Sequence, residues 1–253
     1  MALGIYKKSD IKTPPIPKIV ANSYPAKETN CLRYERKFSM SKPEGVQMSA
    51  RLKEIMPVDH YGDKDGVYLI RSVYFDNWYD TALREKINGY DDRKKYRIRL
   101  YNGNPNYICF ECKQRIYGMT KKTSARINQE QCAMVLNGDI KWMLDVGSPF
   151  LVQAYSHLKL GYHPKTIIEY TRQAFVYSAG HVRITIDKDI RRSTYISAFM
   201  EKVTPTVLVP LDCWAVFEVK YDGFMPLHIR NAVQTGRLFQ QAYSKYANGR
   251  LYG

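Results

Sequence analysis

Several motifs that identify common enzyme classes are absent from this sequence. It contains no G-x-x-x-x-G-K-[ST] loop and no G-x-G-x-x-G turn after a predicted strand, so ATP would not be held by a P-loop or a Rossmann turn. It also has no H-E-x-x-H helix and no G-x-S-x-G elbow. The zinc proteases and serine hydrolases that depend on those motifs are therefore excluded.

Long apolar runs are missing too, and cysteine is scarce. No run approaches the roughly 20 residues of a spanning helix. The N-terminus becomes polar within a few residues, which predicts no signal peptide. Five cysteines, an odd number, stand in a chain of 253 residues that needs no disulfide staples. We therefore expect a reducing, cytoplasmic location, with membrane association only through a partner. Cys109 and Cys112 spell C-x-x-C, but a spacing of three puts them on opposite faces of a strand, so no zinc site is expected.

Positive charge is plentiful. The chain has 39 Lys and Arg against 24 Asp and Glu, a formal net charge of +15. Such a balance favours an anionic partner: nucleic acid, a phosphorylated small molecule, polyphosphate or an acidic membrane surface.

The element pattern predicts an α+β fold in one domain. Residues 1–30 carry four prolines and no clear period, which indicates an extended arm, and residues 31–253 form the domain. Strands are expected over 32–38, 67–76, 96–100, 107–113, 124–127, 165–172, 182–187 and 215–220, with a basic turn over 118–123. Helices are expected after Ser41, over 78–86, 128–136, 150–160 and, as one closing helix, 229–246.

The hairpin at residues 96–113 has one apolar and one charged face. Side chains alternate along a strand, so Arg97 and Arg99 point away from Ile98 and Leu100. In the second strand Glu111 and Lys113 share a face, opposite Ile108 and Phe110. The Asn-Gly-Asn-Pro-Asn stretch over 102–106 supplies the turn.

The same alternation recurs on other predicted strands. Charged residues stand two apart at Arg33/Glu35/Lys37, Arg183/Thr185/Asp187 and Glu218/Lys220, with Arg172 alone. In an open sheet this would be an ordinary solvent face. If the sheet closes into a barrel with helices on its apolar outside, the charged face lies within. An interior with this many cations is costly without an anion.

The order and parity of these segments resemble the triphosphate tunnel metalloenzymes, and within them the vacuolar transporter chaperone domain, the polyphosphate polymerase branch. The matching segments are 33–37, 74–76, 97–101, 111–113, Lys121-Lys122, 170–172, 182–184, 217–220 and 244–246. The resemblance covers roughly residues 31–247. It implies an antiparallel eight-stranded β-barrel, a triphosphate tunnel with helices packed outside.

The resemblance also implies roles for individual residues. Phosphates would be held by Lys37, Arg97, Arg99, Lys113, Arg172, Arg183, Ser244, Lys245 and one of Lys121 and Lys122. Glu218 would hold a manganese or magnesium ion, with Glu35 and Glu111 as less certain ligands. ATP and polyphosphate, rather than nucleic acid, would be the partners, and the terminal phosphoryl group of ATP would pass to a growing polyphosphate chain.

One departure bears on the reaction. Hydrolytic and cyclase members carry Glu-x-Glu-x-Lys on the first strand, where this chain has Arg33-x-Glu35-x-Lys37. The change removes a metal-binding carboxylate and favours the polymerase over its alternative, a tunnel-fold triphosphatase. A non-catalytic module that binds polyphosphate or RNA is the alternative from another class.

Overall fold

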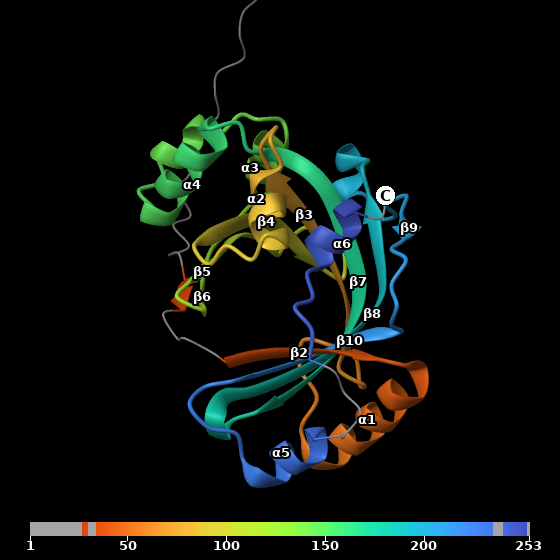
Figure 1. Ribbon diagram of the computed structural model, residues 1–253. Coiled ribbons are helices and arrows are strands. Elements are labelled where there is room, and N and C mark those ends of the chain that lie inside the picture. The colour runs from red at the N-terminus through yellow and green to blue at the C-terminus, as the bar shows by residue number, and fades with distance from the viewer. Residues whose placement is uncertain (1–26, 30–33, 235–239, 252–253) are drawn as a thin grey trace, which may run out of the picture.

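A computed structural model describes residues 27–29, 34–234 and 240–251 (Figure 1). The strands are β1 (Lys27–Thr29), β2 (Tyr34–Met40), β3 (Val67–Asp76), β4 (Arg93–Tyr101), β5 (Ile108–Ile116), β6 (Met119–Ile127), β7 (His163–Tyr177), β8 (Val182–Ser193), β9 (Val207–Leu208) and β10 (Ala215–Tyr221). The helices are α1 (Lys42–Ile55), α2 (Thr81–Ile87), α3 (Gln129–Leu136), α4 (Pro149–Lys159), α5 (Leu227–Val233) and α6 (Lys245–Leu251).

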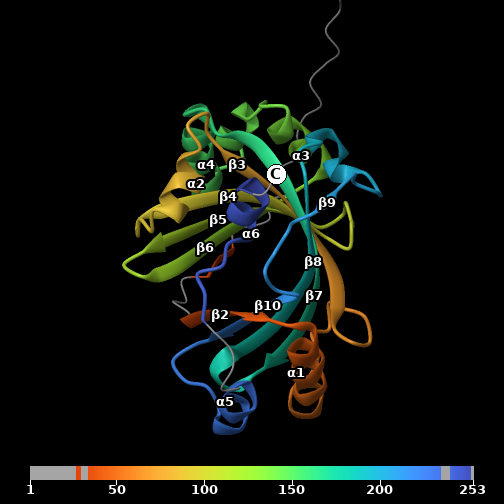
Figure 2. The same cartoon turned by 45° about the vertical axis from the view of Figure 1, so that its right-hand side comes forward.

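All strands belong to one antiparallel sheet with the order β1-β6-β5-β4-β3-β7-β8-β10-β2, and β9 pairs with β8. Eight long strands curl around a common interior, with helices around them (Figures 1 and 2). The predicted eight-stranded antiparallel architecture is confirmed. An ion pair spans the seam between the two ends of the curled sheet, where Lys113 Nζ on β5 lies 2.9 Å from Glu35 Oε2 on β2.

The hydrophobic core lies on the outer face of the curled sheet. At one end, Ile98, Phe110 and Ile127 pack with residues of α3 and α4. At the other, Phe175, Ile184 and Phe217 pack against α1 and α5, which lie below β2 and β10 in Figure 1. Because the apolar half of each alternating strand is used outside, the charged half must face the interior.

Residues with positive φ shape the connections between β4, β5 and β6. Tyr117 and Gly118 form a two-residue turn between β5 and β6, the kind that matches the twist of a hairpin. Asn102 and Gly103, also at positive φ, begin the longer connection from β4 to β5. The predicted basic turn over 118–123 is wrong, since β6 starts at Met119 and its lysines lie in a strand. The turn between β5 and β6 was not predicted because it contains Tyr117, and a tyrosine seldom adopts positive φ.

The first helix follows its sequence signals. Ser41 precedes α1, and the Glu44 carboxylate accepts from its backbone N–H at 2.8 Å, as the capping box predicts. Leu52 and Met56 are buried, whereas Val46 is 57% exposed. Val46 therefore does not belong to the packed face.

The predicted single closing helix over 229–246 is wrong. Helix α5 ends at Val233, and α6 begins only at Lys245. Residues 235–239, within the predicted helix, lie outside the described part of the chain. Between the helices, Gln241 N–H donates to the Lys37 carbonyl at 2.9 Å, so this segment runs beside β2 before it reaches α6.

A buried hydrogen bond fixes the start of α6. Tyr246 Oη donates to Asp76 Oδ2 at 2.6 Å, and Asp76 also accepts from the backbone N–H groups of Ala82 and Leu83 in α2. Helix α6 lies against β7 and β8 (Figure 2). The contact holds Ser244 and Lys245 at a defined place on the rim of the interior.

The remaining expectations concern the N-terminal arm, Arg33, the cysteines and membrane-spanning helices. Within the expected arm, Lys27–Thr29 pair with β6 as β1, and the domain boundary at residue 31 stays a prediction. Arg33 lies outside the described residues. Among described residues, Cys109, Cys112, Cys132 and Cys213 are free thiols, and no described helix is long and apolar enough to cross a bilayer.

Candidate functional site: a cationic cavity inside the sheet

The interior of the curled sheet is a cavity of about 650 Å³. Ten lysine and arginine side chains line it, against three carboxylates. Glu111 and Asp187 lie just behind this lining and pair with it, so five formal positive charges remain in excess. The lining cations are Lys37, Lys95, Arg97, Arg99, Lys113, Lys122, Arg172, Arg183, Lys220 and Lys245.

One wall is the β4–β5 hairpin. Arg97 donates to Glu111 Oε2 at 2.7 Å, and Arg99 lies 3.8 Å from the same oxygen. The other Glu111 oxygen contacts Lys122 Nζ at 2.6 Å. Burial would raise the pKa of Glu111, but Arg97, Arg99 and Lys122 outweigh it and hold that pKa well below its usual value. Glu111 is thus an ionised counter-charge for three cations.

The pairing of strand β6 shows which of the neighbouring residues Lys121 and Lys122 faces the interior. Lys122 faces Lys113 across the β5–β6 pair, whereas Lys121 faces Gln114. Because side chains alternate, only one of the two points into the interior. Lys122 lines the cavity and Lys121 does not.

The opposite wall centres on Asp187 of β8. Arg172 Nε and Nη2 lie 2.6 and 2.7 Å from its two oxygens, a two-pronged contact that fixes the guanidinium plane. Lys245 Nζ lies 2.6 Å from Asp187 Oδ2 and 4.7 Å from the ring centre of Tyr170. Burial would raise the pKa of Asp187, but Arg172 and Lys245 lower it to about 2.

Arg183 occupies another part of the cavity. Its Nη2 donates to Asp59 Oδ2 at 2.6 Å and to Tyr68 Oη at 2.7 Å. Asp59 follows α1, so the loop after this helix reaches the interior. The sequence pattern predicted Arg183 but gave no sign of its partner.

Carboxylates and lysines alternate across the β2–β10 pair. Register places Glu218 opposite Lys37 and Lys220 opposite Glu35. Lys37 Nζ lies 2.9 Å from Glu35 and 3.5 Å from Glu218, and Lys220 Nζ lies 3.0 Å from Glu218. Burial and Glu218 would raise the pKa of Glu35, but Lys220, Lys37 and Lys113 together lower it to about 2.

Two predicted residues meet at the start of α6. Ser244 is buried, and its Oγ accepts from Lys95 Nζ at 3.4 Å. Lys95 was not predicted for the site, although it continues the Arg97–Arg99 parity by one further step. The sequence pattern included Lys220 and Asp187 in the same alternation but assigned them no role.

Other lining residues without a predicted role include Asp59, Tyr68, Tyr74 and Tyr170. Aromatic residues in β-strands usually face the apolar core, so pattern alone could not place these three tyrosines with the cations. Tyr74 Oη accepts from Arg97 Nη1 at 3.2 Å. All predicted site residues except Lys121 and Glu111 line the cavity directly.

The described residues do not form a preassembled metal site. Within the described ranges, no three His, Cys, Asp or Glu side chains are grouped to hold an ion. Glu35 and Glu218 share Lys37 and Lys220 as partners and are the two carboxylates that face the cavity from neighbouring strands.

The comparison with protein families decides where the chain belongs. The VTC domain model matches residues 32–252. The chain belongs to the VTC domain family. A comparison with curated proteins found no match.

Solved structures share the fold of this VTC domain at low sequence identity. HpAC1 from Hippeastrum, whose title reports a dominant triphosphatase activity, is 13% identical, with a TM-score of 0.50 and coverage of 87% of this chain and 95% of that one. The PH1819 protein from Pyrococcus horikoshii is 14% identical, with a TM-score of 0.41 and coverage of 79% and 84%. The first likeness agrees with the tunnel fold expected from the sequence.

The role of Glu111 as a counter-charge gives a stability prediction. Glu111→Gln should lower the free energy of unfolding by about 3–5 kcal/mol, because two buried arginines lose their common partner. Inorganic tripolyphosphate should then raise the melting temperature of the variant more than that of the wild type, since the anion replaces the lost charge. Differential scanning calorimetry measures both effects. The exposed Glu130→Gln is the control, and an equal tripolyphosphate shift in wild type and Glu111→Gln would contradict the assignment.

The lowered pKa of Glu35 predicts an acid-dependent loss of stability. Its folded value of about 2 lies below the ~4.3 of an unfolded glutamate, so acid protonates the unfolded state first. The stabilisation by Glu35 is therefore complete above about pH 5 and disappears as pH falls to about 2. Urea midpoints of wild type and Glu35→Gln should differ most above about pH 5 and converge toward pH 2. A difference that stays constant through this range would refute the prediction.

Proposed function

We propose that this VTC domain is a metal-dependent polyphosphate polymerase that transfers the terminal phosphoryl group of ATP to a growing polyphosphate chain. The observation that carries the proposal is the cavity itself. Its ten cations face one shared cavity inside the curled sheet, and only five carboxylates offset them. A partner rich in closely spaced negative charge supplies what this interior lacks.

The proposed reaction needs the kind of groups that the cavity offers. In phosphoryl transfer the protein mainly positions the phosphates and stabilises charge on the equatorial oxygens. Arg97, Arg99 and Arg172 present planar guanidinium groups, which suit phosphate oxygens, and the carboxylates behind them fix their orientation. Lys113, Lys122 and Lys245 add point charges around the same space.

Glu218 and Glu35 are the residues that would hold a divalent ion. Both offer carboxylate oxygens, the donors that magnesium and manganese prefer, and such ions commonly take one or two protein carboxylates and complete their shell with substrate oxygens and water. When bound, the ion would neutralise charge on the phosphates. Glu111 is a weaker candidate, because Arg97 and Lys122 already engage its two oxygens.

A triphosphatase of the same fold is the second candidate function. It is favoured by the likeness to the Hippeastrum protein, whose title reports that activity. The first-strand sequence Arg33-x-Glu35-x-Lys37 supports the polymerase instead, because a cation replaces one carboxylate that a hydrolytic metal site would use. The two functions differ in whether the acceptor is phosphate or water.

Product analysis separates the two functions. Incubation with ATP and manganese should give a ladder of phosphate chains on a polyacrylamide gel, and chelation of the metal should abolish it. Orthophosphate as the only product would contradict the polymerase and favour the triphosphatase.

Glu218→Gln tests the proposed role of Glu218 in catalysis. The variant should lose about 100-fold or more in kcat/KM while it still binds tripolyphosphate, because a metal ligand is lost and the cations remain. Glu130→Gln, on the outer helix α3, is the matched control. Full kcat/KM in Glu218→Gln would contradict its role as a metal ligand. A binding module would instead show no turnover in wild type and the steep salt dependence of simple charge attraction.

A further inference from the structure

The row of cations on β4 continues past the part of the cavity described above. Arg93, Lys95, Arg97 and Arg99 stand two residues apart, so their side chains leave the same face of the strand. Six residues of strand advance roughly 20 Å, much longer than a triphosphate. The row therefore offers more cations in line than a triphosphate can contact.

Like charges face each other at the outer end of this row. Across the β4–β5 pair, Arg97 is opposite Glu111, but Lys95 is opposite Lys113 and Arg93 is opposite Arg115. Like charges directly opposite on neighbouring strands destabilise a sheet. Two consecutive pairs of this kind are unfavourable for the empty protein, and a bound anion would relieve the repulsion.

Lys95 is the most constrained of these residues. Its Nζ donates to Ser244 Oγ, and within the described residues it makes no ion pair. Burial lowers the pKa of Lys95 well below its ordinary value, and Lys113, Lys37 and Arg97 lower it further. A phosphate beside it would favour the charged ammonium form.

The neighbouring carboxylates compensate only part of this charge. Glu35 contacts Lys113 at 2.9 Å, and Asp91 contacts Arg115 at 3.2 Å. Arg93 donates to the carbonyl of Tyr90, which is neutral. Lys86 of α2, which contacts the Ala242 carbonyl at 3.4 Å, adds another cation near Arg93.

We propose that Arg93 and Arg115, next to the cavity-lining Lys95, form an outer phosphate track that continues the cavity and holds the phosphates of a linear polyphosphate beyond its first three. This assignment rests on the proposed function and names the end of the cavity toward which the polymer extends. Successive cation pairs at the spacing of a strand suit a flexible chain with one charge on every unit.

Binding measurements without ATP or metal test the track directly. The double variant Arg93→Gln/Arg115→Gln, which changes no residue of the cavity lining, should bind inorganic tripolyphosphate within about twofold of wild type, and long-chain polyphosphate about tenfold more weakly, in titration calorimetry at constant salt. Equal losses for both ligands, or no loss for either, would overturn the proposal.

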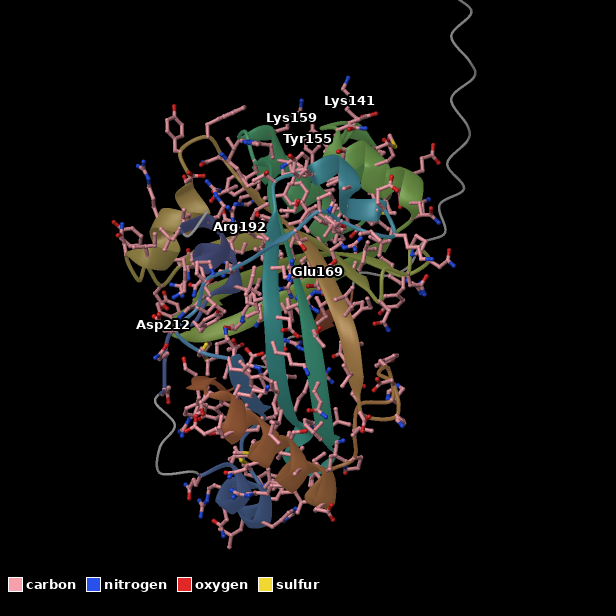
Figure 3. The ribbon with its side chains drawn as sticks, turned by 90° about the vertical axis from the view of Figure 1, so that its right-hand side faces the viewer. Lys141, Tyr155, Lys159, Glu169, Arg192 and Asp212 are labelled. Atoms are coloured by element: carbon pink, nitrogen blue, oxygen red, sulfur yellow. The ribbon has the colours of Figure 1, made fainter. Side chains whose placement is uncertain are left out.

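Control variants separate the track from net charge and from misfolding. Lys141→Gln/Lys159→Gln removes the same charge from the end of the molecule where Figure 3 shows both side chains projecting outward, and should leave both affinities unchanged. A loss in this control equal to that of the track variant would overturn the proposal. Arg115→Gln alone, at an exposed side chain, should also weaken only the long ligand, and by less than the double variant.

Two further outcomes keep this proposal distinct from the proposed function. If wild type makes no polyphosphate from ATP, the polymerase assignment fails. The comparison of tripolyphosphate with long-chain polyphosphate in the binding measurements then still tests the track. If wild type is active, the track variant should make shorter chains at an unchanged initial rate of ADP release, and chains of unchanged length would overturn the track. Equally tight, track-dependent binding of a single-stranded oligonucleotide would also overturn it, because the site would then not select polyphosphate.

Discussion

Repulsion among cations in a shared interior is the constraint on which the rest of this structure depends. Ten lysines and arginines line one cavity, and like charges brought out of water repel strongly. The carboxylates of Glu111, Asp187 and Glu218 contact several of them each, and their lowered pKa values keep them ionised. This partial compensation lets the fold exist without a ligand and leaves a net charge that an anion completes.

The same constraint explains why the core lies on the outer face of the sheet. With the interior reserved for charge, Ile98, Phe110 and Phe217 must be buried outside, and the helices provide that cover. Helix α6 has a different task. The Tyr246–Asp76 hydrogen bond ties it to α2 and brings Lys245 to Asp187, so a helix from the end of the chain completes a site built from strands.

Strand periodicity predicted most strands and showed that Arg97 and Arg99 share one face, because alternation in a strand follows from backbone geometry alone. The closed arrangement of the strands and the inward position of the charged face were expected only from the resemblance to the tunnel enzymes. The turn at Tyr117 and the break before α6 were missed. Each depends on a local backbone conformation that cannot be predicted from the residue types at that position. Asp59 and Tyr68 reach the cavity only through tertiary packing, which no local pattern encodes, and Lys95 was overlooked although it obeys the same parity.

A crystal structure of the domain grown with inorganic tripolyphosphate and manganese would show whether phosphates occupy the interior. We expect phosphate density inside the curled sheet, with oxygens in contact with Arg97, Arg99 and Arg172 and the metal beside Glu218. Phosphate bound only on the outer surface, with the interior ion pairs unchanged, would contradict this expectation.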